Sequence, residues 1–129
     1  MGNRRPEEVA IVVRRPGDAG PEYLVVLRSP EKLGYWHLIA GGVEWDEQPV
    51  VAATRELAEE TRLVAEPVRE RFPAGTERIT VWPFVADAPP GWEPELDDEH
   101  VAARWLDAAG AIALLRYPET REAVRRAAS

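Results

Sequence analysis

Short apolar runs rich in β-branched residues alternate with turn-forming segments over the first third of the chain. Residues 9–13 are apolar without a break, and residues 23–28 repeat the pattern after a turn rich in Gly and Pro at 15–21. Uninterrupted apolar runs of this length are typical of buried strands. The pattern therefore predicts strands over 8–14 and 23–28 that pair as a hairpin with a loose connection.

The clearest helical pattern follows a third predicted strand at 35–40, which Gly41 and Gly42 end. From Gln48 to about Thr61 the apolar residues recur at the spacing of an α-helix. They form one stripe, which continues beyond the helix: Val50, Ala53, Leu57 and Val64. A single apolar stripe is what a helix lying on a sheet requires. The pattern therefore predicts an amphipathic helix packed on a sheet.

The remainder of the chain returns to strands and ends in helices. A strand is predicted at 79–86, although Pro83 favours a sheet edge or a bulge because proline cannot donate a backbone hydrogen bond. A loop at 87–95 comes next, and then a strand and two helices at 101–106, 108–115 and 118–127. No repeat or linker divides the 129 residues, so we expect one domain, with residues 1–6 flexible.

Composition narrows the possible functions. The chain carries 16 Lys and Arg against 23 Asp and Glu, a formal net charge of -7, which argues against a sequence-independent nucleic-acid binder. An acidic protein that handles a polyanion needs a metal ion. The lack of cysteine excludes disulfides, thiolate nucleophiles and cysteine metal sites. Without a signal peptide or an apolar run of about eighteen residues, we expect a cytoplasmic protein with no membrane partner. The oligomeric state does not follow from the sequence.

Three glutamates of the predicted helix carry the candidate chemistry. Glu56, Glu59 and Glu60 are spaced i, i+3 and i+4, so they share one helix face and repel one another by a few tenths of a kcal/mol per pair. A divalent cation would remove that repulsion, and hard carboxylate oxygens suit Mg²⁺ or Mn²⁺. The alternative is a solvated, glutamate-rich helix face with no ligand.

The residues around these glutamates favour the metal site. Gly41 is followed after five residues by Glu47 and after seven more by the run 55–63, Arg-Glu-Leu-Ala-Glu-Glu-Thr-Arg-Leu. This spacing resembles the Nudix box, and Arg62, which stands where the box has glycine, is the one mismatch among its specified positions. Chance agreement at this composition is on the order of 10⁻⁴ for the chain.

The resemblance implies an α/β/α sandwich around a mixed β-sheet, and a metal-dependent hydrolase that cleaves a diphosphate linkage in a nucleoside diphosphate derivative. It makes Glu56, Glu59 and Glu60 the glutamates that bind Mg²⁺ or Mn²⁺, and the backbone carbonyl of Ala40 a further metal ligand. A bound metal neutralises phosphate oxygens and lowers the pKa of water. A nearby carboxylate then accepts the water's proton.

The resemblance also assigns roles to other residues. Arg55 orients a catalytic glutamate, and Glu47 braces the box. The general base is Glu59 or Glu60 if the helix supplies it, or Glu99 if a later loop does. A solvated turn is the alternative reading of the acidic stretch around Glu99.

Arg62 occupies a position at the helix end where the box glycine is left-handed. That conformation costs a non-glycine residue of order 1 kcal/mol. We therefore expect altered geometry in the following turn and no loss of activity.

Looser similarity in the flanks points toward the branch that includes dihydroneopterin triphosphate pyrophosphatases, and so to a nucleoside or pterin polyphosphate substrate. Four residues are candidates to contact it: Arg28, Trp36, Glu44 and Trp82. Trp45 and Trp92 could also stack on a ring; core packing is the alternative for each tryptophan, and Trp105 is expected in the core. His37 and His100 are expected to be hydrogen-bonding neighbours and not metal ligands. The alternative function is a nucleotide-binding sensor that has kept the fold and lost turnover.

Overall fold

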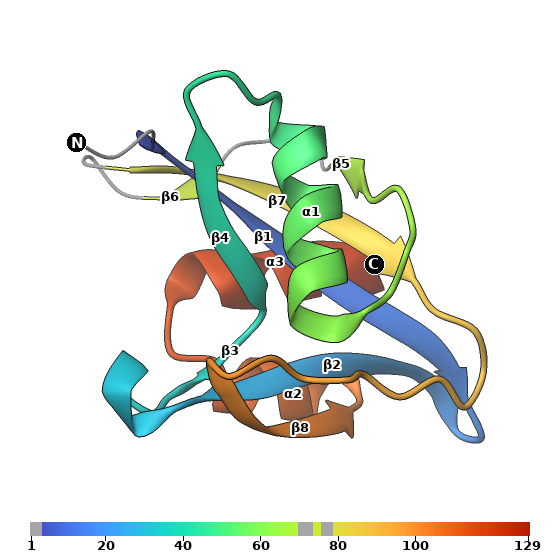
Figure 1. Cartoon of the computed structure of the whole chain (residues 1–129). Helices are drawn as coiled ribbons and strands as arrows, with labels where there is room; N and C mark the ends of the chain where they lie inside the picture. Colours follow the sequence, from blue (N-terminus) through green and yellow to red (C-terminus); the bar gives the residue numbers. More distant parts are fainter. Residues whose placement is uncertain (1–3, 70–73, 76–78) are drawn as a thin grey trace.

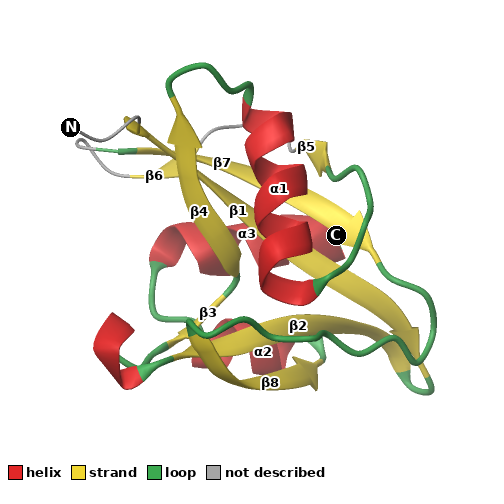
Figure 2. Ribbon diagram, viewed as in Figure 1, coloured by secondary structure: helices red, strands yellow, loops and turns green. Residues whose placement is uncertain are grey.

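A computed structural model describes residues 4–69, 74–75 and 79–129. Within them, eight strands form one mixed sheet with helices on both faces (Figures 1 and 2). The strands are β1 (Arg4–Gly17), β2 (Gly20–Arg28), β3 (Trp36–His37), β4 (Ile39–Glu44), β5 (Val68–Arg69), β6 (Ala74–Gly75), β7 (Thr80–Asp87) and β8 (His100–Leu106). The helices are the 3₁₀ turn η1 (Pro30–Lys32), α1 (Pro49–Thr61), α2 (Ala108–Leu114) and α3 (Pro118–Ala128).

Strand β1 organises the sheet. It runs parallel to β7 from Glu7 to Arg14 and antiparallel to both β4 and β2. Strand β2 extends the sheet to β3 and β8, and β7 extends it to β5 and β6. The parallel pair between β1 and β7 makes the sheet mixed.

Alternation along β1 divides the core into two halves, one on each face of the sheet. Val9, Ile11 and Val13 pack with α1 on one face, whereas Ala10 and Val12 pack with α2 and α3 on the other. All five are at most 2% exposed. Figure 1 shows the result, with α1 in front of the sheet and α3 behind it. Because successive side chains of a strand point to opposite faces, a single central strand anchors both helix layers.

The predicted hairpin is present, but its connection is tight. Strands β1 and β2 pair as far as Gly17 and Gly20, with only two residues between them, and Pro16 pairs with Pro21 just before the turn. Proline's fixed φ is compatible with an extended chain, so the two prolines do not end the strands. The predicted loose connection is therefore wrong.

Two further strand predictions differ from the structure. The strand expected at 35–40 is split into β3 and β4, and β4 continues through Gly41 and Gly42, which pair with β1. Pro83 does not lie in an edge strand, because β7 has partners on both sides. In the described residues Pro83 lies between the short β6 and β5 ladders and belongs to neither, so no hydrogen bond from its nitrogen is needed on that side.

The remaining elements agree closely with the predictions. Helix α1 begins after Gln48 and ends at Thr61, and the last strand and two closing helices lie within two residues of their predicted positions. Val64 lies beyond the helix end and is 87% exposed, so the apolar stripe does not extend to it. Residues 1–3 lie outside the described residues, and β1 already begins at Arg4. Among the residues the structure describes, no helix is long and apolar enough to cross a membrane.

Arg62 ends α1 in a left-handed conformation. Its φ is 68° and its ψ 9°, and its backbone N–H donates to the carbonyl of Ala58 at 2.9 Å. The arginine thus adopts the conformation for which glycine is preferred, and helix geometry at this end is set by the backbone and not by the residue type. The side chain is exposed, so no packing constrains its replacement.

We expect Arg62→Gly to be more stable than Arg62→Ala by about 1 kcal/mol, because only alanine retains the left-handed strain. Both variants lose the same side-chain charge, so the comparison isolates the backbone. Urea unfolding measures the difference. Equal stability of the two variants would show that the left-handed conformation carries no strain here.

Candidate active site

The site begins with a close approach between β4 and α1. The Glu56 side chain lies directly against the backbone of Gly41, and a Cβ atom built on Gly41 would overlap its carboxylate. Glu56 is only 8% exposed. Glycine at position 41 therefore makes room for a buried carboxylate between strand and helix.

A second buried carboxylate lies one helical turn further along. Glu60 is 2% exposed and shares a hydrogen bond with Glu56. Burial raises the pKa of Glu60 to about 11, helped by the hydrogen bond and charge of Glu56 and by the charge of Asp97; a backbone hydrogen bond with Ala40 acts in the opposite direction. Burial and the neighbouring Glu56 carboxylate therefore favour one proton on the Glu56–Glu60 pair over two free negative charges.

Arg55 ties the start of the helix to this pair. Its Nε and one Nη donate to the two carboxylate oxygens of Glu47, each at 2.8 Å, and its other Nη donates to Glu56 at 2.8 Å. The hydrogen bonds to Glu47 raise the pKa of Arg55, with Glu56 adding to the effect, although burial acts against both. Glu47 also accepts from the backbone N–H of Glu44 at 3.0 Å. Arg55 thereby fixes Glu56 and closes the loop between β4 and α1.

Glu59 lies apart from the buried pair. Its side chain is 57% exposed, and its nearest charged partner is Arg55, at 3.6 Å. Of the three glutamates predicted to act together, the structure thus brings Glu56 and Glu60 into contact and leaves Glu59 at the surface. Across the described residues, no three His, Asp or Glu side chains converge on a point ready to hold a metal ion.

Two residues at the start of β8 and just before it lie close to Glu60: His100, which was predicted as a hydrogen-bonding neighbour, and Asp97, which was not predicted. His100 Nδ1 is 2.8 Å from Asp97 Oδ1, and His100 Nε2 is 3.6 Å from Glu60 Oε1. Glu99, the loop residue predicted as a base, instead forms an ion pair with Lys32 at 3.4 Å. The acidic stretch was visible in the sequence, but which of its members faces the helix depends on the path of the loop.

Contacts at several points hold this loop in place. The backbone N–H of Glu95 donates to the carbonyl of Thr61 at 3.0 Å, which ties the loop to the end of α1. Arg15 donates to the Trp92 carbonyl at 2.6 Å and to the Glu93 carboxylate at 2.7 Å. The same guanidinium lies 4.0 Å from the ring centre of Trp105. Trp92 and Trp105 both pack against the half of the core beneath α1, which is the alternative to substrate stacking for Trp92 and the expected place of Trp105.

Of the four predicted substrate contacts, Arg28 and Trp36 lie near the end of β2. Arg28 donates to the Tyr35 hydroxyl at 2.9 Å and pairs across the β2–β8 ladder with His100. Trp36 packs at the edge of the second core half, with the Arg104 guanidinium 5.9 Å from its ring centre. His100 therefore links the two: it pairs with Arg28 across the ladder, and its Nε2 approaches the carboxylate of Glu60.

The other two candidates lie elsewhere. Glu44 is exposed at the end of β4. Trp82 donates from its indole nitrogen to Glu7 at 2.7 Å, and the Arg69 guanidinium lies 4.0 Å from its ring centre. The four predicted substrate contacts therefore do not form one group.

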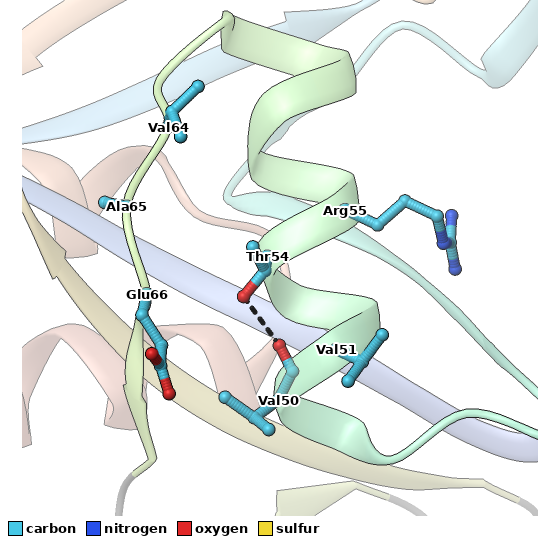
Figure 3. A pocket seen from close by; sticks show the side chains of 7 residues that line it. All are labelled: Val50, Val51, Thr54, Arg55, Val64, Ala65 and Glu66. Carbon is cyan, nitrogen blue, oxygen red and sulfur yellow. Dashed lines mark hydrogen bonds between the residues drawn. The ribbon is translucent and has the colours of Figure 1, made fainter.

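A hollow of about 640 Å³ lies between α1 and the segment that follows it (Figure 3). Its lining is mostly apolar: Val50, Val51, Thr54, Arg55, Val64, Ala65 and Glu66. Figure 3 shows the Arg55 side chain extending away from the rest of the lining. Glu56, Glu59 and Glu60 do not line this hollow, and Arg55 is the residue that it shares with the carboxylate site.

The family model for the NUDIX domain matches residues 4–127. The fold is similar to that of the Escherichia coli dihydroneopterin triphosphate pyrophosphohydrolase, with a TM-score of 0.82, 23% identity, and 98% of this chain and 97% of that chain covered. It is also similar to a Caenorhabditis elegans Ap4A hydrolase, with a TM-score of 0.78, 21% identity and 93% of each chain covered. These similarities confirm the expected mixed sheet flanked by helices.

One curated relative is much longer than this chain. An octanoyltransferase of Myxococcus xanthus is 35% identical over 133 residues, which cover 95% of this chain and 36% of that protein. The chain therefore spans about a third of the length of that relative.

We expect Gly41→Ala to lower the free energy of unfolding by about 1–3 kcal/mol, because its Cβ displaces the Glu56 carboxylate. Urea unfolding of Gly41→Ala, Glu56→Ala and the double variant measures the coupling between the two positions. In the Glu56→Ala background the cost of Gly41→Ala should largely vanish. If Gly41→Ala lowers the free energy of unfolding equally in the Glu56→Ala background, the alanine Cβ does not clash with the Glu56 side chain.

We expect the protein to lose stability in acid, because the pKa of His37 is lower in the folded protein than in the unfolded chain. Burial, followed by the charges of Arg28 and His100, lowers its pKa from 6.5 to about 4. Between those two pH values the unfolded chain binds a proton that the folded protein does not, so stability falls as pH falls, by roughly 3 kcal/mol in full. His37→Gln should lack this component in urea unfolding at pH 7 and pH 4. Parallel pH curves for the two proteins would contradict the assignment.

Proposed function

The chain belongs to the Nudix hydrolase family, and we propose on that basis that it hydrolyses a diphosphate linkage in a nucleoside or pterin polyphosphate, by attack of water at phosphorus. The observation that carries this proposal is the buried Glu56–Glu60 pair, which lies against the backbone of β4 and is bound by Arg55. Two adjacent buried carboxylates are costly unless a proton or a cation lies with them.

The donor set suits a divalent cation such as Mg²⁺ or Mn²⁺. Glu60 Oε2 is buried and has no hydrogen-bond partner among the described residues, and every candidate ligand is an oxygen. Glu56 and Glu60 would hold the cation with the backbone carbonyl of Ala40, and Glu59 is the further ligand that the motif assigns. When bound, such an ion neutralises phosphate oxygens and lowers the pKa of a water molecule.

The chain's own residues supply orientation and proton transfer. Arg55 holds the Glu56 carboxylate in one position, and Glu47 holds Arg55 in turn. The base that takes the proton from water is Glu59 or Glu60 if the helix supplies it, or Glu99 if the later loop does, although Glu99 pairs with Lys32 here. Such a base contributes on the order of 10²–10⁴ in rate.

A polyphosphate substrate agrees with the charge of the protein. The chain has a net charge of -7, and a cation at the carboxylate pair would offset the local negative charge that an anionic substrate meets there. The names of the two structural neighbours add dihydroneopterin triphosphate and Ap4A as compounds to test. Acyl transfer is not part of this proposal, since the M. xanthus relative so named is about three times as long.

The substrate class can be tested by measuring phosphate and pyrophosphate release. The panel is nucleoside triphosphates, sugar nucleotides, dinucleoside polyphosphates and dihydroneopterin triphosphate, each with Mg²⁺ and with EDTA. We expect turnover of at least one class with Mg²⁺ and its loss in EDTA. Binding without turnover on every compound would instead support the sensor.

We expect Glu59→Gln and Glu60→Gln to lower Mg²⁺-dependent turnover by about 10² or more while the fold is kept, because each removes a carboxylate charge and nearly no volume. Glu66→Gln is the matched control, an exposed glutamate in the segment after α1. Steady-state kinetics and circular dichroism provide the readouts. Wild-type turnover in both Glu59→Gln and Glu60→Gln would contradict the metal assignment.

A further inference from the structure

An irregularity at the start of β8 brings His100 to the face of the sheet that α1 covers. Ala103 and Trp105 pack on that face, so regular alternation along the strand would turn Val101 toward α1 and His100 away from it. The β2–β8 ladder instead shifts its register at this point. Val101 is consequently 57% exposed, whereas the His100 side chain is 4% exposed and lies beside Glu60. Such irregularities re-aim single side chains next to functional sites.

Asp97 holds the imidazole of His100 in one orientation. Its Oδ1 lies 2.8 Å from His100 Nδ1 and also accepts from the backbone N–H of Glu99, at 3.2 Å. The backbone N–H of His100 donates to the carbonyl of Asp97 at 3.3 Å, which closes the turn. A carboxylate on Nδ1 fixes how the ring is turned, and the other ring nitrogen, Nε2, then faces Glu60.

The two carboxylate oxygens of Glu60 have different surroundings. His100 Nε2 is 3.6 Å from Oε1, whereas Oε2 is buried and has no hydrogen-bond partner among the described residues. A Mg²⁺ ion lies about 2.0–2.1 Å from its ligand oxygen, so the imidazole leaves no room for one between Nε2 and Oε1. Buried acceptors normally have partners, and a cation at Oε2 would supply the missing one.

We propose that Asp97 and His100 position Glu60 for a divalent cation: Asp97 holds the imidazole of His100, and the imidazole confines Oε1 so that Oε2 is presented to the ion. This rests on the proposed function, because it takes Glu60 to be a metal ligand. Asp97 and His100 act through Glu60 and are therefore positioning residues. Residues that support a metal ligand in this way typically change metal affinity by about 10–100-fold.

The test uses Mn²⁺ alone as the probe, added to the full chain without substrate and followed by electron paramagnetic resonance of the free ion. We expect Asp97→Ala to weaken Mn²⁺ binding by about tenfold or more and Asp97→Asn to recover most of the affinity. Both variants remove the charge, but only asparagine keeps an oxygen that accepts from His100 Nδ1 and from the N–H of Glu99. Asp98→Ala, at an exposed neighbour, is the matched control and should bind within about twofold of wild type.

His100→Ala tests the second residue of the proposal. A neutral imidazole contributes no negative charge, so weaker Mn²⁺ binding in His100→Ala cannot come from lost attraction of the cation. Thermal unfolding by circular dichroism checks the fold of each variant. The Asp97 side chain is 25% exposed, and the Asp97 variants carry the test if His100→Ala unfolds.

Two further readouts connect the effect to Glu60. Mn²⁺ binding should be lost in Glu60→Gln, which shows that the signal reports this site. With Mg²⁺ raised to saturation, the kcat of Asp97→Ala should return to near that of wild type, because Asp97 acts on metal binding and does not touch the substrate.

Three results would overturn the proposal: wild type that binds no Mn²⁺ at Glu60, folded Asp97→Ala that binds Mn²⁺ as wild type does, and Asp97→Asn that binds as weakly as Asp97→Ala. Failure of the proposed function gives a different outcome. Weaker Mn²⁺ binding in Asp97→Ala, recovered in Asp97→Asn, without hydrolysis of any compound would keep the positioning residues and refute the hydrolase. Hydrolysis by wild type with unchanged Mn²⁺ affinity in Asp97→Ala would keep the hydrolase and refute the positioning.

Discussion

The contact between the Glu56 carboxylate and the backbone of Gly41 is the constraint on which the site depends. It sets how closely α1 approaches β4, and so places Glu60, one turn later, in the same buried space. Arg55 maintains the arrangement, because it binds Glu56 and is itself held by Glu47 in the loop that enters the helix. Gly41 on the strand and Arg55 on the helix therefore act together to keep the Glu56 carboxylate buried.

Charge distribution explains how an acidic protein can be suited to an anionic substrate. Under the proposed function the paired carboxylates would hold a cation, and Arg28 lies next to His100, the residue that approaches Glu60. The overall charge of -7 is thus a poor guide to the potential at the site.

Much of the fold followed from hydrophobic periodicity. The helix at 49–61, the paired strands and the two closing helices were predictable because each buries one apolar face, which leaves a regular pattern. The errors occurred at Gly and Pro. Gly41 was expected to end a strand and Pro83 to lie at a sheet edge or bulge. Both lie within paired strands, because Gly41 makes room for Glu56 and the missing N–H of Pro83 falls between two short ladders.

The sequence by itself determined the family and the helix that carries the glutamates, whereas the structure showed that Arg62 keeps the left-handed conformation of the glycine it replaces. Spacing along one helix carries that information, because residues three and four apart share a face. Only the tertiary structure separated buried Glu60 from exposed Glu59, and brought Asp97 and His100 to the helix in place of Glu99. These positions depend on the sheet beneath α1 and on the path of a loop that Arg15 anchors. Contacts between residues so far apart in the chain leave no pattern in the local sequence.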